Sequence, residues 1–156
     1  MSRMGRVIFG LILVFLLVVG CSGNGSDNLG NRTAEERDAV EIDIDLSRLS
    51  TTVLSAEVSN IYSNSREHIG KTIRVRGTYD AVYDPQSNIF FKYILTLDED
   101  DCCKEGFEIR VSGDLVFPDD YPELGTPIEV DGVLRTHNDL GQPLLYLAVD
   151  EIFILN

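Results

Sequence analysis

Two adjacent cysteines, Cys102 and Cys103, are the residues of this sequence best suited to chemistry. They follow the acidic run at 98–101 in the stretch DEDDCCKEG. Two thiolates in one bent loop can bind a borderline ion such as Zn²⁺. A disulfide between them would be strained, because adjacent Cα atoms lie about 3.8 Å apart and disulfides prefer roughly 4.4–6.8 Å. Zinc binding, thiol redox chemistry and a purely structural role therefore all remain open for this pair.

A third zinc ligand could come from one of the two histidines in the chain. If a hairpin places Tyr83 opposite Ile89, the same register carried back along both strands places His68 beside the cysteine pair. We therefore expect Cys102, Cys103 and His68 to form an open Cys₂His site, completed by water or by a neighbouring acid. Zinc is accordingly the expected cofactor, if there is one.

The motifs that catalysis would need do not occur. The sequence has no G-x-S-x-G nucleophile elbow, no H-E-x-x-H and no P-loop. The acids around the cysteine pair oppose a low thiol pKa, which disfavours a cysteine nucleophile. The acidic clusters at 98–101 and 118–123 lack the fixed spacing of a calcium loop, so we interpret them as solvated loops. The sequence predicts a binding protein and not an enzyme.

The N-terminal residues predict export and a lipid anchor. Arg3 and Arg6 precede an apolar run at 7–20 that is too short for a membrane-spanning helix, which needs about 20 residues, but fits a secretory signal. The run ends in LVVGC, which resembles the lipobox of bacterial lipoproteins. That resemblance implies a signal peptide at 1–20 and lipidation of Cys21. An ordinary signal peptide or a short uncleaved anchor is the alternative.

The residues after the leader divide into a tether and a domain. The segment 21–45 begins with the lipidated cysteine and is rich in Gly, Ser, Asn and charged side chains, which predicts a flexible tether. Residues 46–156 are enough for one domain with a single core. We therefore expect a domain held at the cell membrane by its lipid anchor, on the extracytoplasmic side, where thiols tend to oxidise.

The charge balance restricts the partners. The chain has 13 basic and 26 acidic side chains, which gives a net charge of −13. Such a chain repels nucleic acids and the anionic surface of a membrane. We therefore expect contact with the membrane only through the anchor on Cys21, no nucleic-acid partner, and a cation or an envelope protein as the binding partner.

Alternating apolar residues predict five strands. They lie at 71–81, 89–97, 107–111, 126–134 and 144–155. In the second strand the alternation groups one apolar face: Ile89, Phe91, Tyr93, Leu95 and Leu97. Short turns between the strands favour a small barrel, with a β-sandwich as the alternative. Ahead of the strands, residues 51–64 predict one amphipathic helix, with apolar residues at helical spacing: Val53, Leu54, Val58, Ile61 and Tyr62.

A short internal repeat makes the fold prediction more specific. The segment GKTIRVRGTY begins at Gly70 and GTPIEVDGVL begins at Gly125, with Gly, Ile, Val and Gly at matching places. Glycine inside a strand allows a bend where a barrel turns a corner. A five-stranded barrel bent in this way resembles the OB-fold, in which the first and fourth strands pair antiparallel. That pairing would set two arginines against two acids as exposed ion pairs: Arg74 and Arg76 with Glu129 and Asp131.

The prediction is therefore a mainly β fold, an OB-like five-stranded β-barrel with one N-terminal α-helix. Many OB-folds place a helix between their third and fourth strands. Here that stretch is GDLVFPDDYPELG at 113–125, whose prolines disfavour a helix.

A broader resemblance covers roughly residues 58–152. The elements IGK before the first strand, CC followed by GFEI, and YPELGTPIEVDG resemble a clostridial-type family of bacterial lipoproteins with an OB-like domain and a Cys-Cys motif. A fainter similarity links the same block to the C-terminal domain of permease-associated membrane proteins of Gram-positive bacteria, which implies zinc-related work.

Together these observations predict a membrane-anchored extracytoplasmic lipoprotein with a binding role, handling zinc or another metal through the cysteine pair. The alternatives are a protein-interaction or scaffold module with structural cysteines, and a thiol-redox protein.

Overall fold

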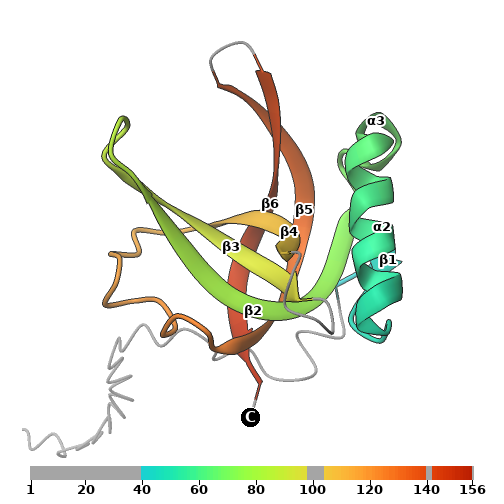
Figure 1. The fold of residues 1–156 in the computed structure, drawn as a ribbon, viewed down its shortest axis with the longest axis horizontal. Coiled ribbons are helices and arrows are strands. Elements are labelled where there is room, and N and C mark those ends of the chain that lie inside the picture. The colour runs from blue at the N-terminus through green and yellow to red at the C-terminus, as the bar shows by residue number, and fades with distance from the viewer. Residues whose placement is uncertain (1–39, 98–103, 140–141, 156) are drawn as a thin grey trace, which may run out of the picture.

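The computed structural model describes residues 40–97, 104–139 and 142–155. They form a mainly β domain in which two helices flank a barrel (Figure 1). Its elements are β1 (Ile44–Asp45), α2 (Thr51–Ser63), α3 (Ser65–His68), β2 (Thr72–Asp84), β3 (Ile89–Leu97), β4 (Lys104–Val111), β5 (Pro127–Asp139) and β6 (Gln142–Ile154). The predicted OB-like barrel is confirmed, and a short second helix, α3, follows the predicted one.

The sheet closes into a barrel because β2 pairs with two partners. Up to Thr78 it runs antiparallel to β5, and from Thr78 onward it runs antiparallel to β3. β4 then pairs antiparallel with β3 and parallel with β6, and β6 returns antiparallel to β5. This ring of five strands confirms the predicted pairing of the first and fourth strands. The hairpins β2–β3 and β5–β6 project from it as two arms (Figure 1).

The two segments that echo each other in the sequence form the seam between β2 and β5. The Gly70 N–H donates to the Leu134 carbonyl, and the Gly125 N–H donates to the Tyr79 carbonyl, both at 2.9 Å. Both glycines adopt left-handed φ angles, 89° and 86°, which favour glycine. Tyr79 and Leu134 end their respective segments, so the two segments bind each other in the same way. The sequence repeat is therefore an approximate two-fold pair in space.

The core fills the barrel and is covered by α2. Residues from all five barrel strands are fully buried, including Val75, Ile94 and Leu147. On α2 the buried residues follow the predicted helical spacing: Leu54, Val58 and Ile61. The predicted helix is thus confirmed, although the ends of its apolar stripe, Val53 and Tyr62, are exposed.

The β2–β3 hairpin differs from the predicted register by one residue. Asp84 pairs with Ile89, whereas Tyr83 was expected there. The Asp84 carboxylate accepts hydrogen bonds from two N–H groups of the turn, and its carbonyl accepts one from the Asn88 N–H at 2.9 Å. These bonds, with Asn88 at a φ of 58°, close a turn that is shorter than predicted.

The shorter turn also exchanges the two faces of β3. Ile94 is fully buried, whereas the apolar set predicted from alternation, with Phe91, Tyr93 and Leu95, is only half-buried. Both faces of this strand are rich in apolar residues, so alternation could not tell which one meets the core. Lys92 shares the face of Ile94, because alternate residues of a strand point the same way.

The fold begins slightly before the predicted end of the tether at residue 45. The Asp43 N–H donates to the Thr72 carbonyl at 3.0 Å, and the Leu46 N–H donates to the Arg74 carbonyl at 2.8 Å. These bonds attach β1 beside β2, and Leu46 packs in the core. The predicted signal peptide at 1–20 and Cys21 lie outside the described residues. Within the part of the chain that is described, no helix has the length and apolar character needed to span a membrane.

Candidate ligand cleft

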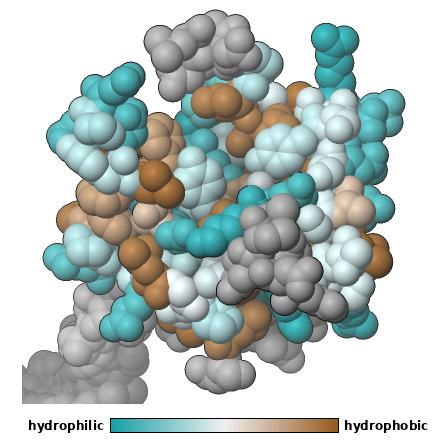
Figure 2. Space-filling model, viewed as in Figure 1, coloured by the Kyte–Doolittle hydropathy of each residue, from teal (hydrophilic) through white to brown (hydrophobic). Residues whose placement is uncertain are grey.

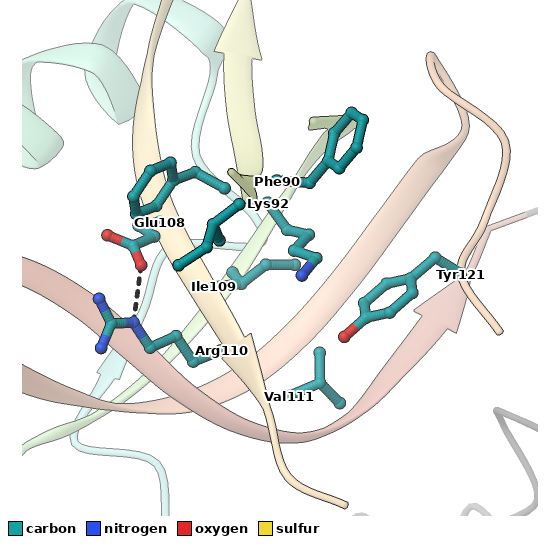
Figure 3. A pocket seen from close by; sticks show the side chains of 9 residues that line it. Phe90, Lys92, Glu108, Ile109, Arg110, Val111 and Tyr121 are labelled. Atoms are coloured by element: carbon teal, nitrogen blue, oxygen red, sulfur yellow. Dashed lines mark hydrogen bonds and ion pairs between the residues drawn. The ribbon is translucent and has the colours of Figure 1, made fainter. Parts of the chain in front are cut away.

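β3 and β4 separate at one end and leave a cleft (Figure 3). Their last pair is Lys92 with Ile109, beyond which β3 follows β2 and β4 follows β6. The opening between the two strands has a volume of about 290 Å³. Residues from both strands and from the segment 112–126 line it, among them Phe90, Phe91, Lys92, Ile109, Arg110 and Tyr121.

Aromatic rings form one side of this region. Tyr83, Phe90, Phe117 and Tyr121 make a continuous series of ring contacts, with centroid separations of 5.0, 4.4 and 5.9 Å. Phe117 and Tyr121 belong to the segment 112–126, which contains no helix, as its prolines predicted. The segment between β4 and β5 therefore packs its aromatic residues against the β2–β3 hairpin.

Lys92 places its ammonium group among these rings. Nζ lies 5.2 Å from the ring centroid of Tyr121 and 5.8 Å from that of Phe117, within the range of cation–π attraction. Figure 3 shows the side chain directed toward Tyr121. No carboxylate in residues 40–97, 104–139 or 142–155 lies within ion-pair distance of it. The cross-strand partners of Lys92 are Ala81 on β2 and Ile109 on β4, so the register supplies no acid.

Arg110 follows Ile109 on β4 and therefore points to the other face of that strand. Its charge is balanced by Glu108. Its Nε donates to a Glu108 carboxylate oxygen at 2.7 Å, its Cζ lies 4.3 Å from the Tyr146 ring centroid, and its Nη2 lies 2.8 Å from His137 Nε2. These groups, from β4, β5 and β6, hold the guanidinium in place. Of the two cations that line the cleft, Lys92 alone lacks an acid in the described ranges.

The tyrosines near the cleft remain neutral well above physiological pH. Burial, and to a smaller extent the Asp120 carboxylate, raises the pKa of Tyr121. Burial also raises the pKa of Tyr79, which stacks on Tyr121 at 6.1 Å. The Tyr79 hydroxyl is buried and has no hydrogen-bond partner in the described part of the chain. Tyr121 can therefore offer the cleft a neutral hydroxyl donor.

The predicted zinc ligands are not brought together within the described ranges. Cys102 and Cys103 lie outside them, and His68 ends α3 with a buried Nδ1 that has no hydrogen-bond partner there. The register that suggested the site is wrong, since β2 turns from β3 to β5 before it could place His68 opposite Lys104. No group of three or more His, Cys, Asp or Glu side chains in the described part could hold a metal. The Cys₂His site stays a prediction.

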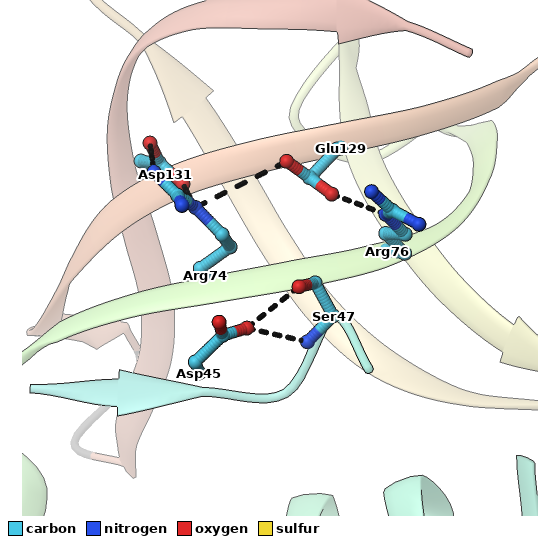
Figure 4. A network of polar contacts seen from close by, with 6 residues as sticks. All are labelled: Asp45, Ser47, Arg74, Arg76, Glu129 and Asp131. Carbon is cyan, nitrogen blue, oxygen red and sulfur yellow. Dashed lines mark hydrogen bonds and ion pairs between the residues drawn. The ribbon is translucent and has the colours of Figure 1, made fainter. Parts of the chain in front are cut away.

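A second polar network lies on the seam between β2 and β5 (Figure 4). Arg74 donates two hydrogen bonds to Asp131, at 2.7 and 2.8 Å, and Arg76 donates to Glu129. The predicted pairs are thus confirmed. Their expected exposure holds for the Arg76 side chain, which is 53% exposed, but not for the two acids, which are only 3% exposed in Glu129 and 9% in Asp131. β6 explains part of this burial, because it places Phe153 opposite Glu129.

β1 adds one more acid beside this seam. The Ser47 hydroxyl donates to the Asp45 carboxylate at 2.6 Å and the Ser47 N–H donates at 2.9 Å (Figure 4). The bond from the Ser47 side chain, with a smaller contribution from Arg74, lowers the pKa of Asp45. The seam therefore sets arginines and acids side by side, and we assign it a structural role.

The cleft was missed in the sequence, although one signal could have found it. Lys92 is the one charged residue in the predicted strand 89–97. A lone charge in an otherwise apolar strand indicates either an edge or a functional site. On the face viewed in Figure 2, apolar and hydrophilic residues are interspersed, so hydropathy alone does not outline the cleft.

Comparison with known proteins identifies no family. No family model matches the chain, and no curated protein matches it. Among solved structures, the chain is similar to the N-terminal domain of PriB protein from Thermoanaerobacter tencongensis, described as dimeric. The two are 19% identical over 55% of this chain and 96% of that one, with a TM-score of 0.37. The functional assignment therefore depends on the geometry of the chain itself.

Proposed function

We propose that this chain is a lipid-anchored, extracytoplasmic binding protein whose barrel takes its ligand in the cleft between β3 and β4. The observation that carries the proposal is the cleft, where apolar and aromatic walls surround a few polar groups, the usual character of a ligand site. OB-folds bind ligands on the face of their second and third strands and at the adjoining loops. In this chain those strands are β3 and β4.

Binding fits the lining residues better than catalysis does. Among the described residues, Lys92, Glu108, Arg110 and Tyr121 are the polar groups that line the cleft, and no Ser, Thr, Cys or His is among them. These lining residues do not include the paired Ser, Thr or Cys nucleophile and His base that covalent catalysis commonly uses. Arg110 and Glu108 neutralise each other, which suits positioning of a ligand.

The anchor is tested on the full chain expressed with labelled fatty acid. We expect the label to enter the parent protein and to be lost in Cys21→Ala, which should move from the membrane fraction to the soluble fraction. Cys21→Ser serves as a second variant of similar size. Membrane retention of both unlabelled variants would contradict the lipid anchor.

The cleft is tested by NMR on the detergent-solubilised full chain. The chain is titrated with a panel of small envelope-type compounds: neutral and acidic sugars, aromatic acids and short peptides. We expect at least one compound to shift the amide signals of Lys92, Ile109 and Tyr121 and to leave those of Arg74 and Asp131 in place. Shifts confined to the seam, or no shift at the cleft with any compound, would contradict the proposal.

The zinc role of Cys102, Cys103 and His68 is a separate prediction with its own measurement. Metal analysis of the purified chain should find about one zinc per chain, and Cys102→Ser with Cys103→Ser should abolish it. His68→Ala should weaken zinc binding if the histidine is a ligand. A metal-free parent in which mild reduction reversibly opens a disulfide to two thiols would favour redox chemistry. A metal-free parent whose thiols stay inert would favour a scaffold role.

A further inference from the structure

We infer that the cleft selects small molecules that carry a single carboxylate on a ring-shaped body, with Lys92 as the counter-ion. This inference depends on the proposed function, because it names the ligand class of the same cleft. It rests on the charge, the size and the aromatic character of the cleft, and on the acids that surround it.

The charge of Lys92 is the first support. The residue is half-buried, its ammonium group lies beside two aromatic rings, and no carboxylate of the described residues lies within ion-pair distance. The rings of Phe117 and Tyr121 attract it but supply no full negative charge. A charge that is partly removed from water is most strongly stabilised by an opposite charge with hydrogen-bonding oxygens. A carboxylate meets both requirements.

The size of the cleft restricts the rest of the ligand. Its volume of about 290 Å³ lies at the lower end of the range for small-molecule sites, roughly 300–1,000 Å³. One ring system with an acid group fits such a space. Phe90 and Tyr121 present ring surface beside Lys92, and aromatic rings pack well against the flat faces of other rings. The Tyr121 hydroxyl can donate a hydrogen bond to the ligand.

The surroundings disfavour a second negative charge. The other cation of the cleft, Arg110, is already paired with Glu108 at 2.7 Å. The segment that supplies Phe117 and Tyr121 also carries four acids: Asp114, Asp119, Asp120 and Glu123. The whole chain has a net charge of −13. A polyanion would meet this repulsion along its length, whereas a single carboxylate would meet it only beside Lys92, whose charge opposes it.

The test compares acids with neutral analogues of the same shape. Benzoate against benzamide and glucuronate against glucose are titrated into the detergent-solubilised full chain, with chemical shifts at Ile109 and Tyr121 as the readout. We expect the acid of at least one pair to bind about tenfold more tightly, or better, than its neutral analogue. The pair that shows the difference tells an aromatic acid from an acidic sugar.

Two variants and one control assign that preference to Lys92. Lys92→Gln should remove the difference between acid and neutral analogue, and Lys92→Arg should keep most of it. Lys71→Gln removes the same charge ahead of β2, away from the residues that line the cleft, and should leave the preference unchanged. A Lys92→Gln variant that folds but retains the full preference would overturn the inference.

The remaining outcomes separate the inference from the proposed function. If acids and neutral analogues shift the cleft signals at the same concentrations, the inference fails and the cleft remains a binding site. A single-stranded oligonucleotide or heparin that binds the cleft more tightly than the acids also overturns the inference. If none of the four probes shifts the cleft signals, the inference fails, and the broader panel then decides whether the cleft binds anything.

Discussion

The seam between β2 and β5 and the cleft between β3 and β4 place their cations in opposite situations. At the seam, Arg74 lies across from Asp131 and Arg76 lies across from Glu129, so each charge has a partner. At the cleft, Lys92 lies across from Ile109, and the pairing of β3 with β4 stops there. Continuous pairing closes the barrel at the seam, whereas the end of pairing leaves the cleft open.

The difference lies in the strand register. The residue that the register places opposite a cation decides whether the cation forms an ion pair within the sheet. The seam is held by two neighbouring cross-strand pairs of opposite sign, which act as structure. The cleft has a cation whose cross-strand neighbours are both apolar, so strand pairing in the described part of the chain gives it no acid. Each prediction below tests one side of this difference.

The largest effect is expected at the seam, for Asp131→Ala. Removing the acid takes the bidentate partner from Arg74, whose side chain is 18% exposed, and leaves its largely buried charge with the longer contact to Glu129 at 4.0 Å. Loss of one partner of a buried pair costs about 3–5 kcal/mol. We therefore expect a fall of about that size in the free energy of unfolding, measured by urea denaturation.

A double variant tests whether the charge imbalance is the cause. Arg74→Met combined with Asp131→Leu replaces both charges by apolar groups, which is often nearly neutral for buried pairs. We expect it to be more stable than Asp131→Ala. If Asp131→Ala unfolds at the urea concentration of the parent, the seam is not the structural element described above.

The next largest loss of stability is expected for Gly106→Ala, at the end of the β3–β4 pair away from the cleft, where the two strands remain paired. Gly106 pairs with Leu95 there, and a Cβ at Gly106 would meet the Ile94 carbonyl oxygen and the Leu95 Cα. Gly106→Ala must push the two strands apart, and overpacking of this kind costs typically about 1–3 kcal/mol. Urea denaturation should show that loss.

The matched control is Lys104→Ala on the same strand. The Lys104 side chain is 60% exposed, and surface substitutions usually change stability by less than about 0.5 kcal/mol. Equal stability of Gly106→Ala and Lys104→Ala would mean that the strands are not tightly joined at this end, and would weaken the contrast with the cleft.

The seam could be predicted from the sequence and the cleft could not, for a physical reason. The seam is encoded twice, by the echo that begins at Gly70 and Gly125 and by charges of opposite sign at matching places. The cleft depends on where the pairing of β3 with β4 ends, which no residue pattern marks. The face that Lys92 takes depends on the turn after Asp84. Hydrogen bonds accepted by the Asp84 carboxylate, together with the left-handed Asn88, close a turn one residue shorter than predicted and place Lys92 on the inner face of β3.

The burial of Glu129 and Asp131 could not be predicted from the alternation of apolar and polar residues either. Arg74 and Arg76 do point away from the core, as predicted, but whether a face is covered depends on neighbouring strands. β1 and the β6 residue Phe153 contribute such neighbours here. Pairing partners can be read from a pattern of charges, whereas exposure needs the assembled barrel.

A smaller, pH-dependent effect is expected at the closed end. The Tyr62 hydroxyl donates to the Gly106 carbonyl at 2.9 Å, and burial raises the pKa of Tyr62 to about 12 from 10.0. The folded state therefore holds this proton more tightly than the unfolded state does. Its contribution is complete below pH 10 and is lost as the pH rises toward about 12. Because Tyr62 is 43% exposed, the effect should be modest.

Tyr62→Phe isolates this contribution. We expect the variant to lose about 1 kcal/mol at neutral pH with the hydrogen bond, and to show a shallower decline of stability above pH 10. Urea denaturation at a series of pH values measures both. A decline as steep as that of the parent would assign the pH dependence to other tyrosines, such as Tyr79, whose pKa burial also raises.

The smallest effect on stability is expected for Lys92→Gln. The substitution removes the attraction between the ammonium group and two rings, a contribution of about 0.5–1 kcal/mol at exposed sites. It also removes the charge of a half-buried residue for which the described part of the chain supplies no acid, which offsets that loss. We therefore expect a change within about 0.5 kcal/mol in urea denaturation.

The matched change at the seam is Arg74→Gln, which leaves Asp131 without its bidentate partner and should cost several-fold more. If Lys92→Gln lowers the free energy of unfolding as much as Arg74→Gln does, Lys92 stabilises the barrel as the seam arginines do. Its charge would then be used for folding and would not be available to a ligand. If it costs almost nothing, the cation is dispensable for folding. Its placement among the rings is then better explained by binding.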